Sequence, residues 1–349
     1  MTIPPFRVLV VDDNPAAVTT VRDRLGEVED RGLAQFAIDT FDDFADATLA
    51  LRNGRYDFAV VDLRYDQDGG APQNDAGLDL FADISSMMFC PVIFYTAYGE
   101  DVGADLRELP FVWVVSKVDP TNIDIVVAEL LDSGILMTIR ELTREVEGEV
   151  REYLWSQQSL ARLLTIGDQV KPVLFRRVAS KLDCTEGQER AAGVPASRMY
   201  LYPPVTETLT CGDVLRRGDH WEVLLTPACD LVERSGGAPN GEYLRLVRAL
   251  TAESVDMGRT AEAEWLKRVH TGGKPRYSFL PAFIEIPRLI VDLQQASTPL
   301  RTQVIADLER GSVERVATLD TPYAEELLVR SSQYLGRVGS PDLANNNFG

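Results

Sequence analysis

The sequence predicts a doubly wound α/β domain on a five-stranded parallel sheet, followed by a long helix and a β-rich α+β domain. Three observations predict this fold class. Residues 6–132 alternate continuous apolar runs with helix-like segments, which is typical of strands buried on both faces of a parallel sheet. Gly134 ends the alternation and a helical pattern follows. Beyond residue 184 short strands and turns dominate.

The elements of the first domain follow from this alternation. Asn14 and Pro15 come directly after the first apolar run, and they predict a helix start because Asn caps helices and Pro suits the first turn. We expect strands over Phe6–Val11, Phe36–Thr40, Tyr56–Leu63, Pro91–Thr96 and Phe111–Ser116, and helices over Pro15–Asp30, Phe41–Arg52, Gly77–Met87, Tyr98–Leu109 and Thr121–Leu131.

A helix is expected over Ile135–Leu164. Ile139, Val146, Tyr153 and Leu160 repeat every seven residues, as in a coiled-coil seam. Two interpretations stay open. The helix either packs on its own domain or is an interdomain signalling helix that forms a homodimer through these four residues.

The second half is predicted to be a β-rich domain. Its closely alternating strands and turns suggest a small barrel-like module. We expect the domains to be residues 1–133, a helical linker over 134–183, a β-rich domain over 184–341 and a flexible tail over 342–349. Its expected strands are Met199–Tyr202, Val214–Arg217, Trp221–Thr226, Tyr243–Ala249, Arg276–Leu280 and Ile284–Leu293, and its helices are Ala261–His270 and Pro322–Tyr334.

Composition and charge exclude several classes of protein. No run of about 18 apolar residues predicts a membrane span, and the N-terminus lacks a signal-peptide pattern, so a cytoplasmic location is expected. Residues 1–135 carry 25 acidic and 9 basic residues, a net charge of −16, and the remainder carries 29 and 26, a net charge of −3. The first domain therefore repels nucleic acid, and the second has no basic stripe, which makes nucleic-acid binding unlikely.

Polar side chains follow the predicted strands where each strand ends. Asp12 and Asp13 follow the first strand, Asp62 ends the third, Thr96 ends the fourth, and Lys117 follows the fifth. Ligands of parallel α/β sheets bind at this carboxyl edge. Clustered carboxylates repel one another unless a hard divalent cation, Mg²⁺ or Mn²⁺, neutralises them. With a lysine and a hydroxyl nearby, Asp62 is equipped to be the nucleophile of a phosphoryl transfer.

The stretches VLVVDDNP, VVDLR, FYTAY and VSK stand in the order and approximate spacing of response-regulator receiver domains of two-component systems. The resemblance covers residues 6–132 and implies a flavodoxin-like fold and a histidine kinase or phosphotransfer protein as the phosphodonor. It implies that Asp62 accepts the phosphoryl group, that Thr96 and Lys117 contact that group with room left by Ala97, and that Mg²⁺ or Mn²⁺ binds Asp12, Asp13, Asp62 and the backbone carbonyl of Arg64.

Three positions depart from the receiver pattern. The loop Leu63–Ala76 is longer than usual, Val118 replaces the usual proline after the lysine, and Val114 stands where the family has its aromatic switch residue. The usual coupling between the threonine and that aromatic residue is therefore in doubt, and Tyr98 is a possible substitute.

The chemistry of the second half stays open. The main hypothesis is an output domain that contacts an unknown protein target. An enzyme is the alternative, with Cys229 as nucleophile, His270 as base and Asp230 as orienting group. A zinc site is disfavoured because Cys184, Cys211, Cys229, His220 and His270 are not spaced in pairs.

Overall fold

The structure, a computed structural model, describes residues 4–65, 75–156, 168, 170–185, 194–232, 240–258 and 260–337, without the side chains of 182–185. Contacts divide the chain into two units, Met1–Cys184 and Thr185–Gly349. No described helix is both long and apolar enough to cross a membrane. The tail 342–349 and most of the loop Leu63–Ala76 lie outside the described residues.

The first unit contains the predicted five-stranded parallel sheet. Its strands stand in the order β2-β1-β3-β4-β5, and every pair is parallel. This is the flavodoxin-like order, in which the strand sequence reverses next to the first strand. The five strands are β1 (Phe6–Val11), β2 (Phe36–Phe41), β3 (Phe58–Val61), β4 (Val92–Thr96) and β5 (Val112–Ser116).

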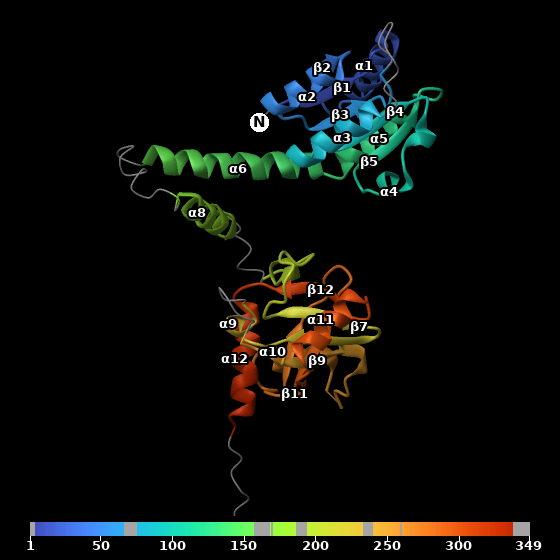
Figure 1. Ribbon diagram of the computed structural model, residues 1–349. Coiled ribbons are helices and arrows are strands. Elements are labelled where there is room, and N and C mark those ends of the chain that lie inside the picture. The colour runs from blue at the N-terminus through green and yellow to red at the C-terminus, as the bar shows by residue number, and fades with distance from the viewer. Residues whose placement is uncertain are drawn as a thin grey trace, which may run out of the picture. The chain divides into compact units, whose positions relative to one another are not determined.

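Helices cover both faces of this sheet (Figure 1). One apolar core joins the sheet to α1 (Pro15–Asp30) and α5 (Asn122–Asp132), and a second core joins it to α2 (Phe44–Asn53) and α3 (Ala76–Met87). β1 and β3 are buried along almost their whole length, because apolar side chains on both strand faces meet these helices. The predicted doubly wound fold is confirmed.

The helix predicted over Tyr98–Leu109 is wrong. A 3₁₀ turn, η1 (Gly99–Asp101), and a single helical turn, α4 (Ala104–Arg107), replace it. Val102 between them is extended and buried. The side chain of Arg107 donates to the Val102 carbonyl at 3.0 Å and also to that of Gly99, so the loop satisfies its carbonyls without a continuous helix.

The long helix α6 (Ile135–Ser156) begins directly after Gly134, which has a φ of +71°. The rest of the predicted helix, including Leu160, lies outside the described residues. A further helix, α8 (Val170–Thr185), belongs to the same unit. Its Arg177 lies 2.6 Å from Glu149 and stacks 5.2 Å from the ring centre of Tyr153, so α8 covers one side of α6.

The second unit is β-rich, as predicted, and its strands form one antiparallel sheet in the order β10-β11-β9-β8-β7-β12-β6. The two edges of the sheet approach each other. The hydroxyl of Tyr200, in edge strand β6, donates to the carbonyl of Pro281, which follows edge strand β10, at 2.8 Å. The strands are β6 (Tyr200–Leu201), β7 (Asp213–Arg217), β8 (His220–Leu224), β9 (Leu246–Thr251), β10 (Tyr277–Leu280), β11 (Leu289–Ser297) and β12 (Glu314–Leu319).

Two predicted elements of this unit shift, and one strand and the helices α9 (Ala228–Leu231) and α11 (Arg301–Glu309) were missed. The strand expected over Ile284–Leu293 begins only at Leu289, because Phe283 and Ile286 bridge across a tight turn in which Ile284 has a φ of +51°. The strand expected to begin at Tyr243 begins at Leu246. The missed strand is β12. The other helices are α10 (Glu262–His270) and α12 (Tyr323–Leu335), with 3₁₀ turns at Ala196–Arg198 and Ala252–Ser254.

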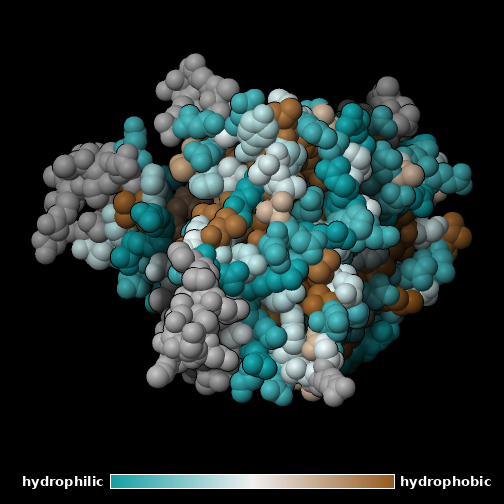
Figure 2. Space-filling model, turned by 90° about the horizontal axis from the view of Figure 1, so that it is seen from below, coloured by the Kyte–Doolittle hydropathy of each residue, from teal (hydrophilic) through white to brown (hydrophobic). Residues whose placement is uncertain are grey.

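Apolar side chains occur in small groups between hydrophilic ones on the molecular face drawn in Figure 2. In the described part of the second unit, many large apolar side chains are buried in three cores. Its main core joins the sheet to α12, and smaller cores lie under α10 and α11.

Candidate functional site

Three carboxylates meet at the carboxyl edge of the parallel sheet. Asp12 and Asp13 follow β1, and Asp62 follows β3. Because β1 and β3 are neighbours in register, the residues after them lie side by side. Within the described residues, these three are the only group of at least three His, Cys, Asp or Glu side chains whose ligand atoms lie within 4.8 Å of one another. The structure therefore brings together the three side chains that the sequence placed at this edge.

One lysine joins two of these carboxylates. The Nζ atom of Lys117 lies 2.7 Å from Oδ2 of Asp62 and 2.8 Å from Oδ2 of Asp12. The backbone N–H of Lys117 donates to the carbonyl of Thr96 at 3.0 Å, which holds the end of β5 against the end of β4. Two buried carboxylates, Asp12 and Asp62, therefore share one ammonium group, with Asp13 beside them.

Burial makes this arrangement costly for the carboxylates. Asp12 is 3% exposed and Asp62 is 7% exposed. Burial raises the pKa of Asp12 above its usual range, although Lys117 acts in the opposite direction. Burial also acts to lower the pKa of Lys117, but its hydrogen bonds with Asp12 and Asp62 outweigh that effect and raise the pKa. Lys117 is therefore protonated at neutral pH and leaves an excess of negative charge that a divalent cation would neutralise.

Thr96 lies fully buried at the end of β4. Its hydroxyl oxygen accepts the backbone N–H of Tyr98 at 3.1 Å. The bond leaves the hydroxyl proton available to an acceptor at the site, since the oxygen is the acceptor here. Thr96 thus connects the carboxylate cluster to the loop that carries Tyr98.

Tyr98 is tied to the residue two positions after Asp62. The guanidinium of Arg64 stacks on the Tyr98 ring, with its central carbon 3.4 Å from the ring centre, and it pairs with Asp101 at 2.8 Å. The sequence did not predict this stack, because nothing in the spacing of the two residues shows that their loops meet. The Arg64 side chain points to Tyr98 and Asp101, and its carbonyl oxygen stays a proposed metal ligand.

Gly77 is required where α3 passes Asp62. A Cβ atom on Gly77 would lie 2.2 Å from the carbonyl oxygen of Asp62 and 2.8 Å from Cα of Leu63. Both atoms belong to the backbone and cannot move aside. The Gly77 N–H donates to the Leu63 carbonyl at 3.0 Å. The first turn of α3 therefore lies directly against the residues that position Asp62.

The position of the aromatic switch is occupied by a small side chain that packs internally. Val114 contacts the core under α3, and Trp113 faces the opposite core. A Cβ atom on Gly99 would lie 3.1 Å from Cγ1 of Val114, so the loop after Tyr98 rests on Val114. Tyr98, which is 44% exposed, is the aromatic side chain nearest in sequence to Thr96 on this loop.

The enzyme alternative receives no support from the geometry of the second unit. Cys229 is exposed, and its sulfur lies 3.8 Å from Oδ1 of Asp230. Within the described residues, no hydrogen bond or ion pair joins His270 to Cys229. The His270 carbonyl instead accepts from Arg330 at 3.2 Å. Cys211 and His220 belong to no described metal-binding group, and the Cys184 side chain lies outside the described residues.

Buried carboxylates of the second unit have individual arginine partners. Asp213 is fully buried, and burial raises its pKa. Burial acts to raise the pKa of Asp292, but hydrogen bonds from Arg276, Gln295 and the backbone of Gln294, together with the charge of Arg276, lower it. The pairs are Asp213 with Arg315 at 2.8 Å, Asp292 with Arg276 at 2.6 Å, and Asp307 with Arg217 at 2.8 Å and Arg310 at 2.6 Å.

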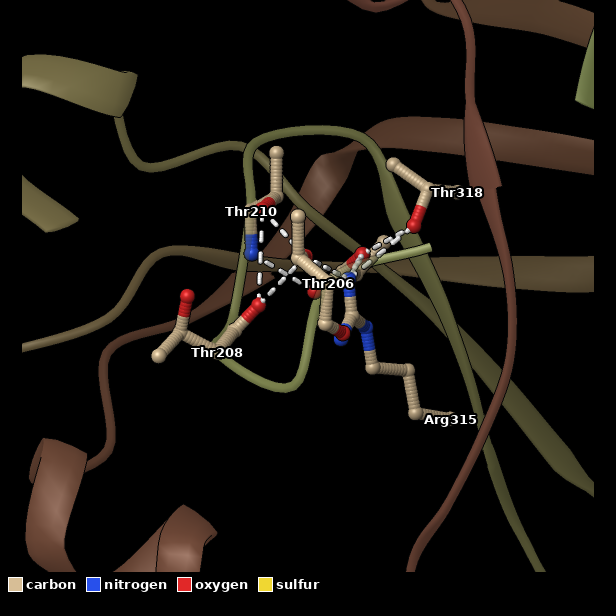
Figure 3. Close-up of polar contacts among 6 residues, drawn as sticks. Thr206, Thr208, Thr210, Arg315 and Thr318 are labelled. Atoms are coloured by element: carbon tan, nitrogen blue, oxygen red, sulfur yellow. Dashed lines mark hydrogen bonds and ion pairs between the residues drawn. The ribbon is translucent and has the colours of Figure 1, made fainter. Parts of the chain in front are cut away.

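The Asp213 pair anchors a threonine-rich loop (Figure 3). Asp213 accepts the hydroxyl of Thr318 at 2.6 Å and the backbone N–H of Thr210 at 2.7 Å. Arg315 donates to the hydroxyl of Thr206 at 3.0 Å and to its carbonyl. The loop before β7 is thereby fixed to β12, which makes this cluster a structural element.

Solved structures similar to the N-terminal third of the chain are response-regulator receiver domains. The PhyR receiver domain of Erythrobacter litoralis is 21% identical, with 36% of this chain and 90% of that chain covered and a TM-score of 0.30. A CheY-like receiver domain of Methylobacillus flagellatus is 19% identical (36% and 98% covered, TM-score 0.29). TrrA of Thermotoga maritima, solved with Mg²⁺ and BeF, is 23% identical (36% and 98% covered, TM-score 0.29).

No protein-family model matches the chain, and none of the curated proteins is similar to it. The strand order gives the first unit its flavodoxin-like fold, and the three carboxylates cluster at the carboxyl edge of its sheet.

Proposed function

We propose that the first unit is a phosphoacceptor receiver domain of a two-component response regulator. Asp62 would accept a phosphoryl group from a histidine kinase or a phosphotransfer protein. The observation that carries the proposal is the contact of one lysine, Lys117, with both Asp62 and Asp12 beside a third carboxylate, Asp13. Such an excess of buried negative charge does not stabilise a fold, but it suits cation binding and phosphoryl transfer.

The side chains of the site have separate roles in this reaction. An oxygen of Asp62 attacks the phosphorus, the bond from phosphorus to the donor breaks, and the donor's leaving group takes up a proton. Lys117 exchanges part of its contact with the carboxylates for a contact with the transferred group, where its charge opposes the charge on the phosphoryl oxygens. The Thr96 hydroxyl donates to one of these oxygens.

A divalent cation fits the same cluster. Asp12, Asp13, Asp62 and the backbone carbonyl of Arg64 would hold Mg²⁺ or Mn²⁺, since all four offer the hard oxygen ligands that these ions prefer. The bound ion would supply positive charge to the incoming phosphoryl oxygens.

Phosphorylation with a small donor tests the proposal. With acetyl phosphate and Mg²⁺, the intact protein should gain the mass of one phosphoryl group, and hydroxylamine should remove it because an acyl phosphate is labile to that reagent. Asp62→Asn should abolish the gain. Asp119→Asn, which changes an exposed carboxylate near the same edge, is the matched control and should be labelled as the wild type is. Labelling of Asp62→Asn would overturn the assignment.

We further propose that residues 184–341 act as an output domain through contact with a protein, with the helical linker 134–183 carrying the signal. The near-neutral charge of this half and the arginine partners of its buried carboxylates support this function over nucleic-acid binding and catalysis. Tyr98 would couple the phosphoryl group to the loop, because closure of Thr96 on the phosphoryl group changes the environment of the N–H that Tyr98 donates to it.

A homodimer through α6 belongs to this proposal, with a modified contact face. Tyr153 of the predicted seam is buried beneath Arg177 of the same chain. The open face is next to it and holds Val146, Val150 and Leu154, which line a cavity of about 530 Å³ with the exposed Trp155. A ligand shifts an equilibrium only when it favours one state, so phosphorylation should change the strength of this dimer.

Light scattering with and without phosphodonor tests the dimer. The wild type should be dimeric in at least one of the two conditions, and a Val146→Glu, Leu154→Glu double variant should be monomeric in both. Val329→Glu, at an exposed apolar position of α12, is the control. A monomer in every condition, or a dimer that the double change leaves intact, would show that α6 packs only within its own unit.

A further inference from the structure

A groove of about 570 Å³ lies between α6 and the amino edge of the parallel sheet. Its receiver wall comes from the start of β1 and from the segments that precede β3 and β4, and its other wall is the first half of α6. Because all five strands are parallel, this edge is opposite to the one that holds Asp62. The groove is therefore separate from the phosphorylation site.

The walls of the groove are fixed to each other. Arg140 of α6 pairs with Asp57 through two hydrogen bonds of 2.7 and 2.6 Å. It also donates to the carbonyls of Pro4 and Pro5 at 2.8 and 2.7 Å, and its guanidinium stacks 4.2 Å from the ring centre of Phe6. The groove is thus preformed, which lowers the entropy cost of binding a ligand there.

Two of the four arginines that line the groove have no ion-pair partner within the described residues. Arg7 and Arg140 pair with carboxylates. Within the described part of the chain, Arg55 and Arg144 form no ion pair, although Arg55 donates to the hydroxyl of Thr143 at 3.2 Å. Two carboxylates line the groove: Asp57, which pairs with Arg140, and Glu147. Two available guanidinium groups in a domain of net charge −16 form a local cationic site.

Apolar side chains lie between these arginines. Met87, Phe89 and Leu142 line the groove and are 39, 45 and 43% exposed. Met88 and Ile139 continue the apolar lining. Exposed apolar side chains grouped beside charged ones mark binding surfaces, and Met in particular adapts to the shape of a partner.

We propose that this groove binds an acidic, apolar peptide segment of a partner protein. Large apolar side chains of the peptide would lie on Phe89 and Leu142, and its carboxylates would pair with Arg55 and Arg144, since planar guanidinium groups bind carboxylates with two parallel hydrogen bonds. The positive charge of the lining favours this occupant over a basic peptide, and the net charge of −16 over residues 1–135 disfavours a nucleic-acid backbone. Binding at this edge requires no phosphoryl group on Asp62.

Selection from a random twelve-residue peptide library on the immobilised full-length protein tests the site. The selected peptides should combine Asp or Glu with Leu, Phe or Trp. Fluorescence anisotropy of the consensus peptide should show saturable binding that weakens with salt. The Arg55→Glu, Arg144→Glu double variant should raise the Kd about tenfold or more, because it replaces two attractive contacts with repulsive ones.

Two further variants make the outcome decisive. Leu142→Gln removes apolar contact without changing charge and should also weaken binding. Arg268→Glu, at an exposed position of α10 in the second unit, makes one such charge reversal elsewhere and should leave the Kd unchanged. Phosphorylation by acetyl phosphate, measured on each variant, should match the wild type and confirm an intact receiver. Peptides without an acidic and apolar consensus, or a Kd that neither the double variant nor Leu142→Gln alters, would overturn the proposal.

Discussion

The two units of this chain use buried carboxylates in opposite ways. In the first unit, Asp12 and Asp62 share a single lysine, and Asp13 lies beside them. In the second unit, Asp213 and Asp292 each have an arginine of their own. A buried carboxylate that is removed from water without full compensation destabilises the fold. This difference fits the proposed function, in which an aspartate with its own arginine stabilises the fold and a carboxylate cluster with one shared lysine suits the binding of a further positive charge.

The largest expected effect on the free energy of unfolding comes from replacing the cationic partner of a buried carboxylate. The two units should respond to Mg²⁺ differently. Arg315→Met leaves Asp213 buried without its guanidinium and should lower the free energy of unfolding by about 3–5 kcal/mol. Lys117→Met leaves a cation-binding cluster, so Mg²⁺ should restore part of its loss. Urea denaturation with and without Mg²⁺ measures both. A Mg²⁺-dependent recovery in Arg315→Met, or none in Lys117→Met, would break the comparison.

Glycine substitutions give the next largest effect and test how tightly the first site is built. Gly77→Ala places a Cβ atom 2.2 Å from a backbone oxygen of Asp62 and should cost ~1–3 kcal/mol, with impaired phosphorylation. Gly148→Ala is the matched control in the middle of α6, where nothing lies within 4 Å of the new atom. It should raise stability by ~0.5–1 kcal/mol. Thermal unfolding of both variants, measured alongside phosphoryl incorporation, checks the pair.

Replacement of a single carboxylate by an amide should change the free energy of unfolding least, and the change should have opposite signs in the two units. Asp13→Asn removes one of three mutually repelling charges and should raise the unfolding free energy in Mg²⁺-free buffer by ~0.5 kcal/mol. Asp307→Asn weakens two arginine contacts and should lower it by ~1 kcal/mol. Equal signs in urea denaturation would show that the two sets of carboxylates do not differ in kind.

The sequence predicted the first unit well because local signals and function coincide there. Each site residue directly follows an apolar run, and parallel strands bring such residues to one edge whatever the loop lengths. The helix predicted over Tyr98–Leu109 failed because Gly99 and Gly103 weaken it and Val102 is buried in extended form. The stack of Arg64 on Tyr98 had no sequence signal.

The second unit was predicted less well because its order depends on contacts between distant residues. Asp213 and Arg315 are joined across β7 and β12, and neither residue alone shows that they pair. β12 itself carries charged residues at its start, which hides it from a search for apolar runs. The apolar pattern of α11 is weak because one of its buried positions holds a charged residue. This residue is Asp307, which pairs with Arg217.

Calorimetric titration of the full-length protein with Mg²⁺ tests the central claim most directly. We expect one Mg²⁺ site in the wild type and markedly weaker Mg²⁺ binding in Asp13→Ala. Asp12→Ala should lose a similar or slightly smaller amount of affinity, since each change removes a carboxylate of the cluster. Asp307→Asn, which alters an arginine-paired carboxylate of the second unit, should bind Mg²⁺ as the wild type does. Equal Mg²⁺ affinity in the wild type, Asp12→Ala and Asp13→Ala would contradict the assignment of the acidic cluster as a cation site.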